Sequence, residues 1–164
     1  ALQLLILTAT RSGEVRLADW SEVELDARTW TIPAKRMKMK EKHVIPLSDH
    51  SLKVLHQAKA LGTEGLIFPG MRTGRPMSDM TMSKLVKELG YPVDIHGFRT
   101  SFRTWVQEQT NNAGEVAERA LAHKATNKVE AAYARSDLFE KRRKLMDTWA
   151  SYLDNEPAKV VQLR

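Results

Sequence analysis

One imidazole and one phenol stand ten positions apart in the stretch LAHKATNKVEAAY, as His123 and Tyr133. A polar break follows the imidazole, and a short helical segment from Val129 carries the phenol among small alanine neighbours. A phenol with a pKa of about 10 is a poor nucleophile at neutral pH, so it needs cationic help before it can attack anything. Taken alone, the stretch favours a plainer interpretation, a half-buried core tyrosine beside a helix-capping histidine.

Cations elsewhere in the chain could supply that help. Two guanidiniums can clamp the non-bridging oxygens of a phosphate, and a lysine can protonate a leaving alkoxide. One histidine can accept the phenol proton while another hydrogen-bonds the phosphoryl group, so that the tyrosine attacks phosphorus. With no carboxylate cluster at metal-ligand spacing, charge stabilisation would come from arginine rather than Mg²⁺. The residues that stand at breaks between apolar segments, and so could play these parts, are Arg11, Lys38, His96, Arg99, His123 and Tyr133.

Simpler structural explanations exist for several of these residues. Arg11 could form a salt bridge with Glu14, and a lone His96 would more often be a satisfied structural histidine. Together, His96 and Arg99 make a better anion site, because they are three apart at a helix start, where free backbone N–H groups favour anions. An isolated guanidinium in a dry core is costly, so these residues and His123 are expected to converge on one basic concavity that faces solvent or an anion.

Composition narrows the range of partners. The chain has 164 residues, which suits one domain, and its net charge of +6 makes nucleic acid the default partner. It contains no cysteine, which excludes disulfides and thiolate metal sites and suits a reducing cytoplasm. The opening run ALQLLILTA is too short to span a bilayer and lacks the features of a signal peptide. The missing initiator methionine leads us to expect a fragment of a longer protein.

Periodicity predicts a mainly α fold with a small three-stranded antiparallel β-sheet, an α+β class. Ser12 is expected to cap a short second helix, Ser48 a helix to about Leu61, and Gly90 to end a helix that starts at Ser78. Asp137 and Glu140 resemble a capping box for the last helix. The expected strands are Trp20–Leu25, Thr29–Pro33 and His43–Pro46, and the other expected helices are Ala1–Ala9, Gly13–Ala18, one from His96, Ala113–Leu121 and Leu138–Leu153.

The hairpin between the second and third strands, AKRMKMKEK, carries a dense group of cations. Such a tip is a poor core element and a good phosphate probe, although a solvated loop explains most of its lysines. Together with basic positions in a later loop and on the helix after His96, these residues form the expected DNA-binding set: Lys35, Arg36, Lys40, Lys42, Arg72, Arg75 and Arg103.

Four motifs resemble, in order, the catalytic domain of the tyrosine recombinases, the phage integrase family, and more narrowly its prophage-type integrases. They are TATRSGEVRLADW, KRMKMKEKHVIPLS, HGFRTSFRTW and LAHKATNKVEAAYAR. Each motif alone is weak evidence, whereas four in the family's order, across about Leu2 to Leu153, are strong evidence. Ala9 departs from the glycine that many members have before the first arginine, at little expected cost.

The resemblance implies a role for each candidate residue. Arg11 and Arg99 would clamp the phosphate, with His96 as general base or phosphate ligand and His123 as second phosphate ligand. Tyr133 would be the nucleophile. Lys38 would be the general acid, although Lys35, Lys40 and Lys42 are close enough to compete for that role.

The implied reaction is site-specific strand exchange through a 3′-phosphotyrosine link, which releases a 5′-hydroxyl and requires neither metal nor ATP. The implied partners are double-stranded attachment sites, further copies of the chain in a tetramer and DNA-bending accessory proteins, on the nucleoid of a bacterial cytoplasm. Residues 1–154 would form the catalytic domain and 155–164 a tail. The alternatives are a type IB topoisomerase, a non-catalytic DNA-binding module and a generic basic helical adaptor.

Overall fold

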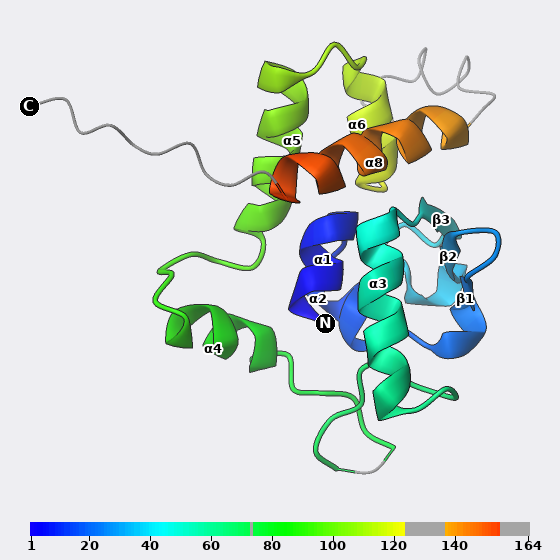
Figure 1. The fold of residues 1–164 in the computed structure, drawn as a ribbon, viewed down its shortest axis with the longest axis vertical. Coiled ribbons are helices and arrows are strands. Elements are labelled where there is room, and N and C mark those ends of the chain that lie inside the picture. The colour runs from blue at the N-terminus through cyan, green and yellow to red at the C-terminus, as the bar shows by residue number, and fades with distance from the viewer. Residues whose placement is uncertain (73, 124–136, 155–164) are drawn as a thin grey trace, which may run out of the picture.

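The fold is that of a computed structural model, which describes residues 1–72, 74–123 and 137–154. It consists of short helices around one small sheet (Figure 1). In chain order the helices are α1 (Leu2–Thr8), α2 (Ser12–Arg16), α3 (Asp49–Ala58), α4 (Thr81–Glu88), α5 (Gly97–Gln109), α6 (Gly114–Ala120) and α8 (Phe139–Asp154). Single 3₁₀ turns lie at Trp20–Glu22, Ala34–Arg36 and Lys59–Leu61.

The sheet is antiparallel with strand order β1-β2-β3, where β1 is Val23–Glu24, β2 is Thr29–Ile32 and β3 is His43–Pro46. Trp30 of the central strand pairs with Ile45 of β3. The side chains of β2 alternate, so Trp30 and Ile32 are fully buried while the two threonines are half-buried. The predicted class, mainly α with a small three-stranded antiparallel sheet, is confirmed.

Three local predictions were wrong. The helix expected from Ser78 begins only at Thr81, because the Ser78 hydroxyl accepts the Met80 amide at 3.3 Å in a turn that precedes the helix. Side-chain hydrogen bonds also explain the other two. The first strand was expected from Trp20, but Asp19 accepts a hydrogen bond from the Ser21 amide at 3.0 Å and starts a 3₁₀ turn instead. Ser12 was expected to cap α2, but Arg11 holds the cap position and donates its backbone N–H to the Glu14 carboxylate at 2.8 Å. Both cases reflect the preference of acidic side chains for free N–H groups at helix starts.

Other predicted boundaries agree with the structure. Ser48 caps α3 by accepting the Ser51 amide at 3.3 Å, and β3 has the predicted bounds. Gly90 follows α4 with a φ of 86°, the left-handed conformation that ends a helix at low cost for glycine. At the start of α8 the Asp137 carboxylate accepts the Phe139 amide at 3.0 Å, but Glu140 pairs with Arg143 at 3.8 Å and does not complete the predicted capping box.

Two clusters of buried side chains form the interior. One joins α1, α2, the sheet, α3 and α4, with Leu4, Trp30 and Leu55 fully buried. The other joins α5, α6 and α8, where Phe102 and Trp149 meet edge to face with ring centroids 5.4 Å apart. In Figure 1, α5, α6 and α8 lie together above α1 and α3, with the sheet to one side. Any site built from both ends of the chain must lie where these two groups of elements meet.

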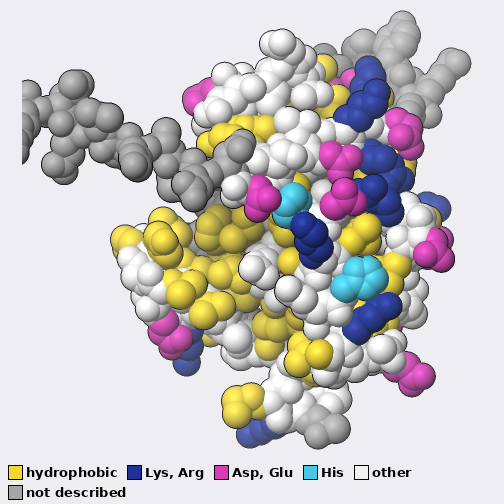
Figure 2. Space-filling view, viewed as in Figure 1, with side chains coloured by type: hydrophobic (Ala, Val, Ile, Leu, Met, Phe, Trp, Pro, Cys, Tyr) yellow, Lys and Arg dark blue, Asp and Glu magenta, His cyan; other side chains and the backbone are white. Residues whose placement is uncertain are grey.

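One face of the molecule separates apolar from charged side chains (Figure 2). Hydrophobic side chains gather over α4, where Leu85 and Leu89 are exposed, whereas acidic and basic side chains are interspersed over α3 and α8. Within the described residues, no helix combines the length and hydrophobicity needed to cross a membrane.

Candidate active site

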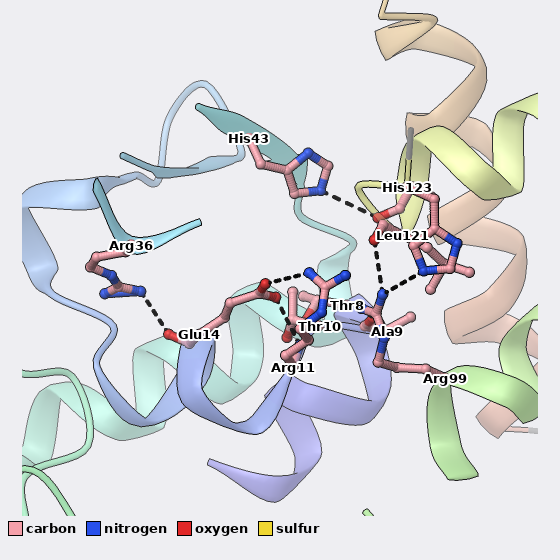
Figure 3. Close-up of polar contacts among 11 residues, drawn as sticks. Thr8, Ala9, Thr10, Arg11, Glu14, Arg36, His43, Arg99, Leu121 and His123 are labelled. Atoms are coloured by element: carbon pink, nitrogen blue, oxygen red, sulfur yellow. Dashed lines mark hydrogen bonds and ion pairs between the residues drawn. The ribbon is translucent and has the colours of Figure 1, made fainter. Parts of the chain in front are cut away.

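Arg99 lies on the first turn of α5, and its guanidinium is buried against two other parts of the chain. It donates one hydrogen bond to the carbonyl of Ala9, at the end of α1, and another to the carbonyl of Leu121 at 2.8 Å. A third contact of 3.3 Å joins the same nitrogen to Nε2 of His123. Three segments far apart in sequence therefore meet at one guanidinium (Figure 3).

The candidate cations were expected to face solvent or an anion. Arg99 is 4% exposed and so does not face solvent, and its two carbonyl acceptors explain how the structure tolerates the charge. The pKa of Arg99 is lowered to about 10, first by burial and then by the nearby charge of Arg11, while Glu14 opposes the shift. The group stays cationic at neutral pH and is held rigidly.

Arg11 stands on the opposite side of the same small space, at the start of α2 (Figure 3). Its Nη1 donates to the Glu14 carboxylate at 2.8 Å, so the simple ion pair considered from sequence does form. That pair does not remove Arg11 from the candidate site, because its side chain stays 28% exposed and its charge acts on Arg99. The carboxylate orients one guanidinium edge and leaves the rest of the donor fork for another acceptor.

His123 joins this pair from the end of α6. Its Nδ1 lies 2.7 Å from the Glu118 carboxylate, and its Nε2 faces Arg99. A carboxylate only accepts and a guanidinium only donates, so these two neighbours favour the tautomer with its proton on Nδ1. Glu118 also pairs with Arg103 at 2.8 Å. Arg103, expected from sequence as a DNA contact, therefore already has a carboxylate partner, although 58% of its side chain is exposed.

The basic hairpin between β2 and β3 divides into exposed and inward-facing cations. Lys35, Lys38, Lys40 and Lys42 are exposed. Arg36 is different, because its guanidinium donates to the Glu14 carbonyl at 2.7 Å and pairs with Glu22 at 3.2 Å. With its side chain 14% exposed, Arg36 braces the base of the hairpin against α2, so we do not carry it into the proposed DNA-contacting set.

Within the described residues, no hydrogen bond or ion pair joins the side chain of His96, Arg72 or Arg75 to this centre. His96 is exposed at the cap position of α5, and its imidazole makes no hydrogen bond to any residue in the described ranges. It shares a helix start with Arg99, but the two side chains point to different environments, one exposed and one buried. Arg72 and Arg75 are exposed on the loop before α4. Tyr133 lies outside the described residues.

Two side chains near the centre, one half-buried and one buried, escaped the sequence reasoning. His43 of β3 lies 3.2 Å from the carbonyl of Ala120 through Nε2, and Arg142 of α8 donates to the Val44 carbonyl at 2.6 Å. His43 sits in a run that reads as an ordinary strand, and Arg142 in a run of basic residues on a helix. The only available signal was an imidazole within an otherwise apolar strand, which is too weak to single out a residue.

The centre is thus built to receive an anion. Two guanidiniums and one imidazole approach one another from α2, α5 and the end of α6, and among the described residues the acidic groups in contact with them, Glu14 and Glu118, orient donors. Within the described ranges, no group of three or more histidine, aspartate or glutamate side chains is placed to hold a metal ion. Fixed cations of this kind can hold a phosphodiester and stabilise the negative charge that grows on it during attack.

Comparison with known proteins extends these observations. Residues 1–139 match the sequence model of the Phage integrase family. The integrase of Enterobacteria phage P4 is 37% identical over 182 residues, a match that covers 99% of this chain and 42% of that protein. The chain therefore spans less than half of that relative's length.

Solved structures agree on the fold. The integrase from mycobacterium phage Brujita superposes with a TM-score of 0.71 at 18% identity, covering 96% of this chain and 53% of that one. A lambda integrase tetramer bound to a Holliday junction gives a TM-score of 0.55 at 21% identity, covering 83% of this chain and 41% of that one. The family match covers well over half of the chain and agrees with both the fold and the order of the motifs. The chain belongs to the phage integrase family.

Proposed function

We propose that this chain cleaves and rejoins DNA strands in site-specific recombination, as the catalytic domain of a prophage-type integrase formed by residues 1–154. The observation that carries the proposal is the meeting of Arg11, Arg99 and His123, which come from three separate segments and leave donors for one more acceptor. Membership of the family supports the assignment of that acceptor as a phosphodiester of DNA.

In the proposed reaction, Tyr133 attacks the phosphorus and its phenolic proton passes to a base, for which His96 is the candidate. The phosphodiester bond to the 5′ oxygen breaks, and Lys38 donates a proton to that leaving oxygen. A 3′-phosphotyrosine link and a free 5′-hydroxyl result. A 5′-hydroxyl from a partner strand then attacks the link, which restores both the phosphodiester and the phenol without net consumption of either.

The arrangement explains the division of work within the site. Arg99 is rigid and desolvated, so it costs little reorganisation when charge develops on the phosphate. Arg11 and the lysines at the hairpin tip are more exposed and can adjust to the bound duplex. The remaining exposed cations would contact phosphates: Lys35, Lys40, Lys42, Arg72, Arg75 and the free edge of Arg103. Their electrostatic contribution to DNA affinity falls as the salt concentration rises.

The proposed partners follow from the same chemistry. Strand exchange needs two duplexes and several active sites, so further copies of the chain would assemble on paired attachment sites. The lambda integrase, similar in fold, is seen as a tetramer on a Holliday junction. DNA-bending accessory proteins and a location on the bacterial nucleoid belong to the same proposal.

A covalent-capture experiment tests the proposed function. Full-length protein is incubated with a library of nicked duplexes whose central positions are randomised, and adducts that survive denaturing electrophoresis are recovered and sequenced. The expected result is an adduct with wild-type protein that selects a defined sequence. Tyr133→Phe removes one oxygen and should abolish the adduct while leaving affinity for the selected duplex almost unchanged. An adduct that persists in this variant would assign the nucleophile to another residue.

A further inference from the structure

Strand β3 makes two side-by-side contacts that bracket the segment carrying Tyr133. On one side, Nε2 of His43 lies 3.2 Å from the carbonyl of Ala120, in the last turn of α6. On the other, Nη1 of Arg142 donates to the Val44 carbonyl at 2.6 Å, at the start of α8. His43 and Val44 are consecutive, so their α-carbons are only about 3.8 Å apart. The described chain on either side of residues 124–136 is therefore attached to the same dipeptide.

We propose that His43 and Arg142 are positioning residues for strand transfer, which fix the two ends of segment 124–136 on β3 and so set where Tyr133 can meet the phosphate. This inference rests on the proposed function of Tyr133. It deepens that function by naming two residues that touch neither the DNA nor the reacting atoms.

The contact on the α6 side holds the other members of the centre as well. The Ala120 carbonyl that faces His43 is adjacent to the Leu121 carbonyl that accepts from Arg99, and His123 follows two residues later. A carbonyl only accepts, so the imidazole must donate from Nε2. Burial lowers the pKa of His43 to about 4, with the charges of Arg142 and Arg99 acting in the same direction against Glu14 and the Ala120 contact. The imidazole therefore stays neutral at pH 7, which a donor between two buried guanidiniums requires.

The contact on the α8 side is a fork rather than a single bond. Besides the bond to Val44, Arg142 donates from Nε to the Asp137 carbonyl and from Nη2 to the Asp137 carboxylate, both at 2.8 Å. Asp137 in turn accepts the Phe139 amide and starts α8. Arg142 is 2% exposed, so this fork is a fixed internal connection. Tyr133 lies four residues before Asp137, and four residues of chain reach at most about 14 Å.

The same strand carries the candidate general acid. Lys38 lies five residues before His43 on the hairpin that β3 closes. Strand β3 is thus continuous with the hairpin that carries Lys38. It also contacts the end of α6, which precedes His123, and the start of α8, which follows Tyr133 in sequence. Correct placement of acid, clamp and nucleophile depends on a common support, and reaction rates fall steeply with small misplacements.

The test uses two substitution pairs in full-length protein. His43→Leu removes the donor at similar size, while His43→Gln offers a replacement N–H donor without a titrating ring. Arg142→Lys keeps the charge but loses the fork. If Arg142→Lys folds poorly, Asp137→Ala removes the exposed carboxylate that Arg142 binds and so weakens the same attachment. His56→Leu on the exposed face of α3 and Arg143→Lys beside Arg142 are matched controls.

Amide hydrogen exchange, measured without DNA, reports the attachments directly. His43→Leu should speed exchange at Leu121 and His123, whose amides bond to Ala117 and Glu118, and leave Arg142 unaffected. Arg142→Lys or Asp137→Ala should speed exchange at Phe139 and Arg142 but not at Leu121. Unchanged exchange in all three variants would overturn the proposal.

Cleavage rate on the duplex recovered by covalent capture reports positioning. Adduct formation at saturating protein should slow about tenfold or more in His43→Leu and Arg142→Lys, and recover in His43→Gln, while affinity and both controls stay near wild type. A substrate with sulfur at the 5′ bridging position has a leaving group that needs no general acid. It should not rescue the variants if the nucleophile is misplaced, and rescue would show that they act only through Lys38.

The outcomes separate this inference from the function on which it rests. If wild-type protein forms no adduct, the proposed function fails, whatever the exchange data show. If wild-type protein reacts and the variants exchange faster yet cleave at the wild-type rate, the attachments are structural only and the positioning inference is overturned. Faster exchange with slower cleavage, reversed by glutamine at position 43, supports it.

Discussion

Protonation of His43 should weaken the fold in a pH window that its structure defines. The folded pKa of about 4 lies below the ordinary value of 6.5, first because the ring is buried and then because Arg142 lies nearby. The unfolded chain therefore binds more protons than the folded chain between these values, so stability rises with pH across this window. From pH 7 to pH 5 this group alone should remove about 2 kcal/mol of unfolding free energy, and its full effect is about 3 kcal/mol below pH 4.

The assay is urea unfolding of wild-type protein and His43→Gln at intervals between pH 7.5 and pH 4.5. Glutamine does not titrate, so the difference between the two curves isolates the imidazole from every other titrating group. Wild-type protein should lose stability relative to the variant on acidification, by about 2 kcal/mol at pH 5. Parallel curves would show that the ring is solvated in the folded state, and would refute the structural reasoning about its burial.

Four further substitutions test other parts of the site. Arg99→Ala should slow adduct formation by about 10²–10³-fold and flatten the salt dependence of DNA binding by roughly one log–log unit, because the fixed charge is lost. It should also lower the unfolding free energy by about 2 kcal/mol, since two buried carbonyls lose their donor. Normal cleavage by this variant would show that Arg99 is not part of the phosphate clamp. Glu118→Gln should slow adduct formation about 3- to 10-fold at unchanged affinity, because the His123 tautomer loses its charged acceptor; equal rates in single-turnover cleavage would contradict that role. Arg36→Met should cost about 3 kcal/mol in urea unfolding, because Glu22 loses its guanidinium partner and keeps only the Trp30 indole and the Asp19 amide as donors. It should leave the salt slope unchanged, whereas Lys40→Ala should reduce that slope by about one unit with normal stability; the reverse pattern would exchange their roles.

The sequence predicted the parts of the fold that depend on local patterns. The short β-rich run HVIP identified β3 with its bounds. Ser48 and Gly90 indicated the start of α3 and the end of α4, because a cap or a left-handed turn depends on one residue and its neighbours. The class of fold followed from such elements. Where two side chains competed for one role, as Ser12 and Arg11 did at the start of α2, the pattern could not decide.

The candidate site was predictable only as a set of residue types. Motif order identified Arg99, but its burial depends on two backbone carbonyls that only the fold brings to it. Arg36 looked like its exposed neighbours on the hairpin, yet Glu14 and Glu22 draw it inward. His43 and Arg142 carry no motif at all. Long-range contacts decide each of these cases, and local sequence does not contain them.

The division of the interior into two clusters gives the anion a mechanical role. Arg11 is fixed to the cluster around α2 and the sheet, whereas Arg99 and His123 are fixed to the cluster of α5, α6 and α8. Ile6 packs against both clusters. The charge of Arg11 lowers the pKa of Arg99, so the two guanidiniums repel each other across this junction. A phosphate bound by both guanidiniums would replace that repulsion with two attractive contacts. The scissile group itself would then hold the two clusters of the domain together.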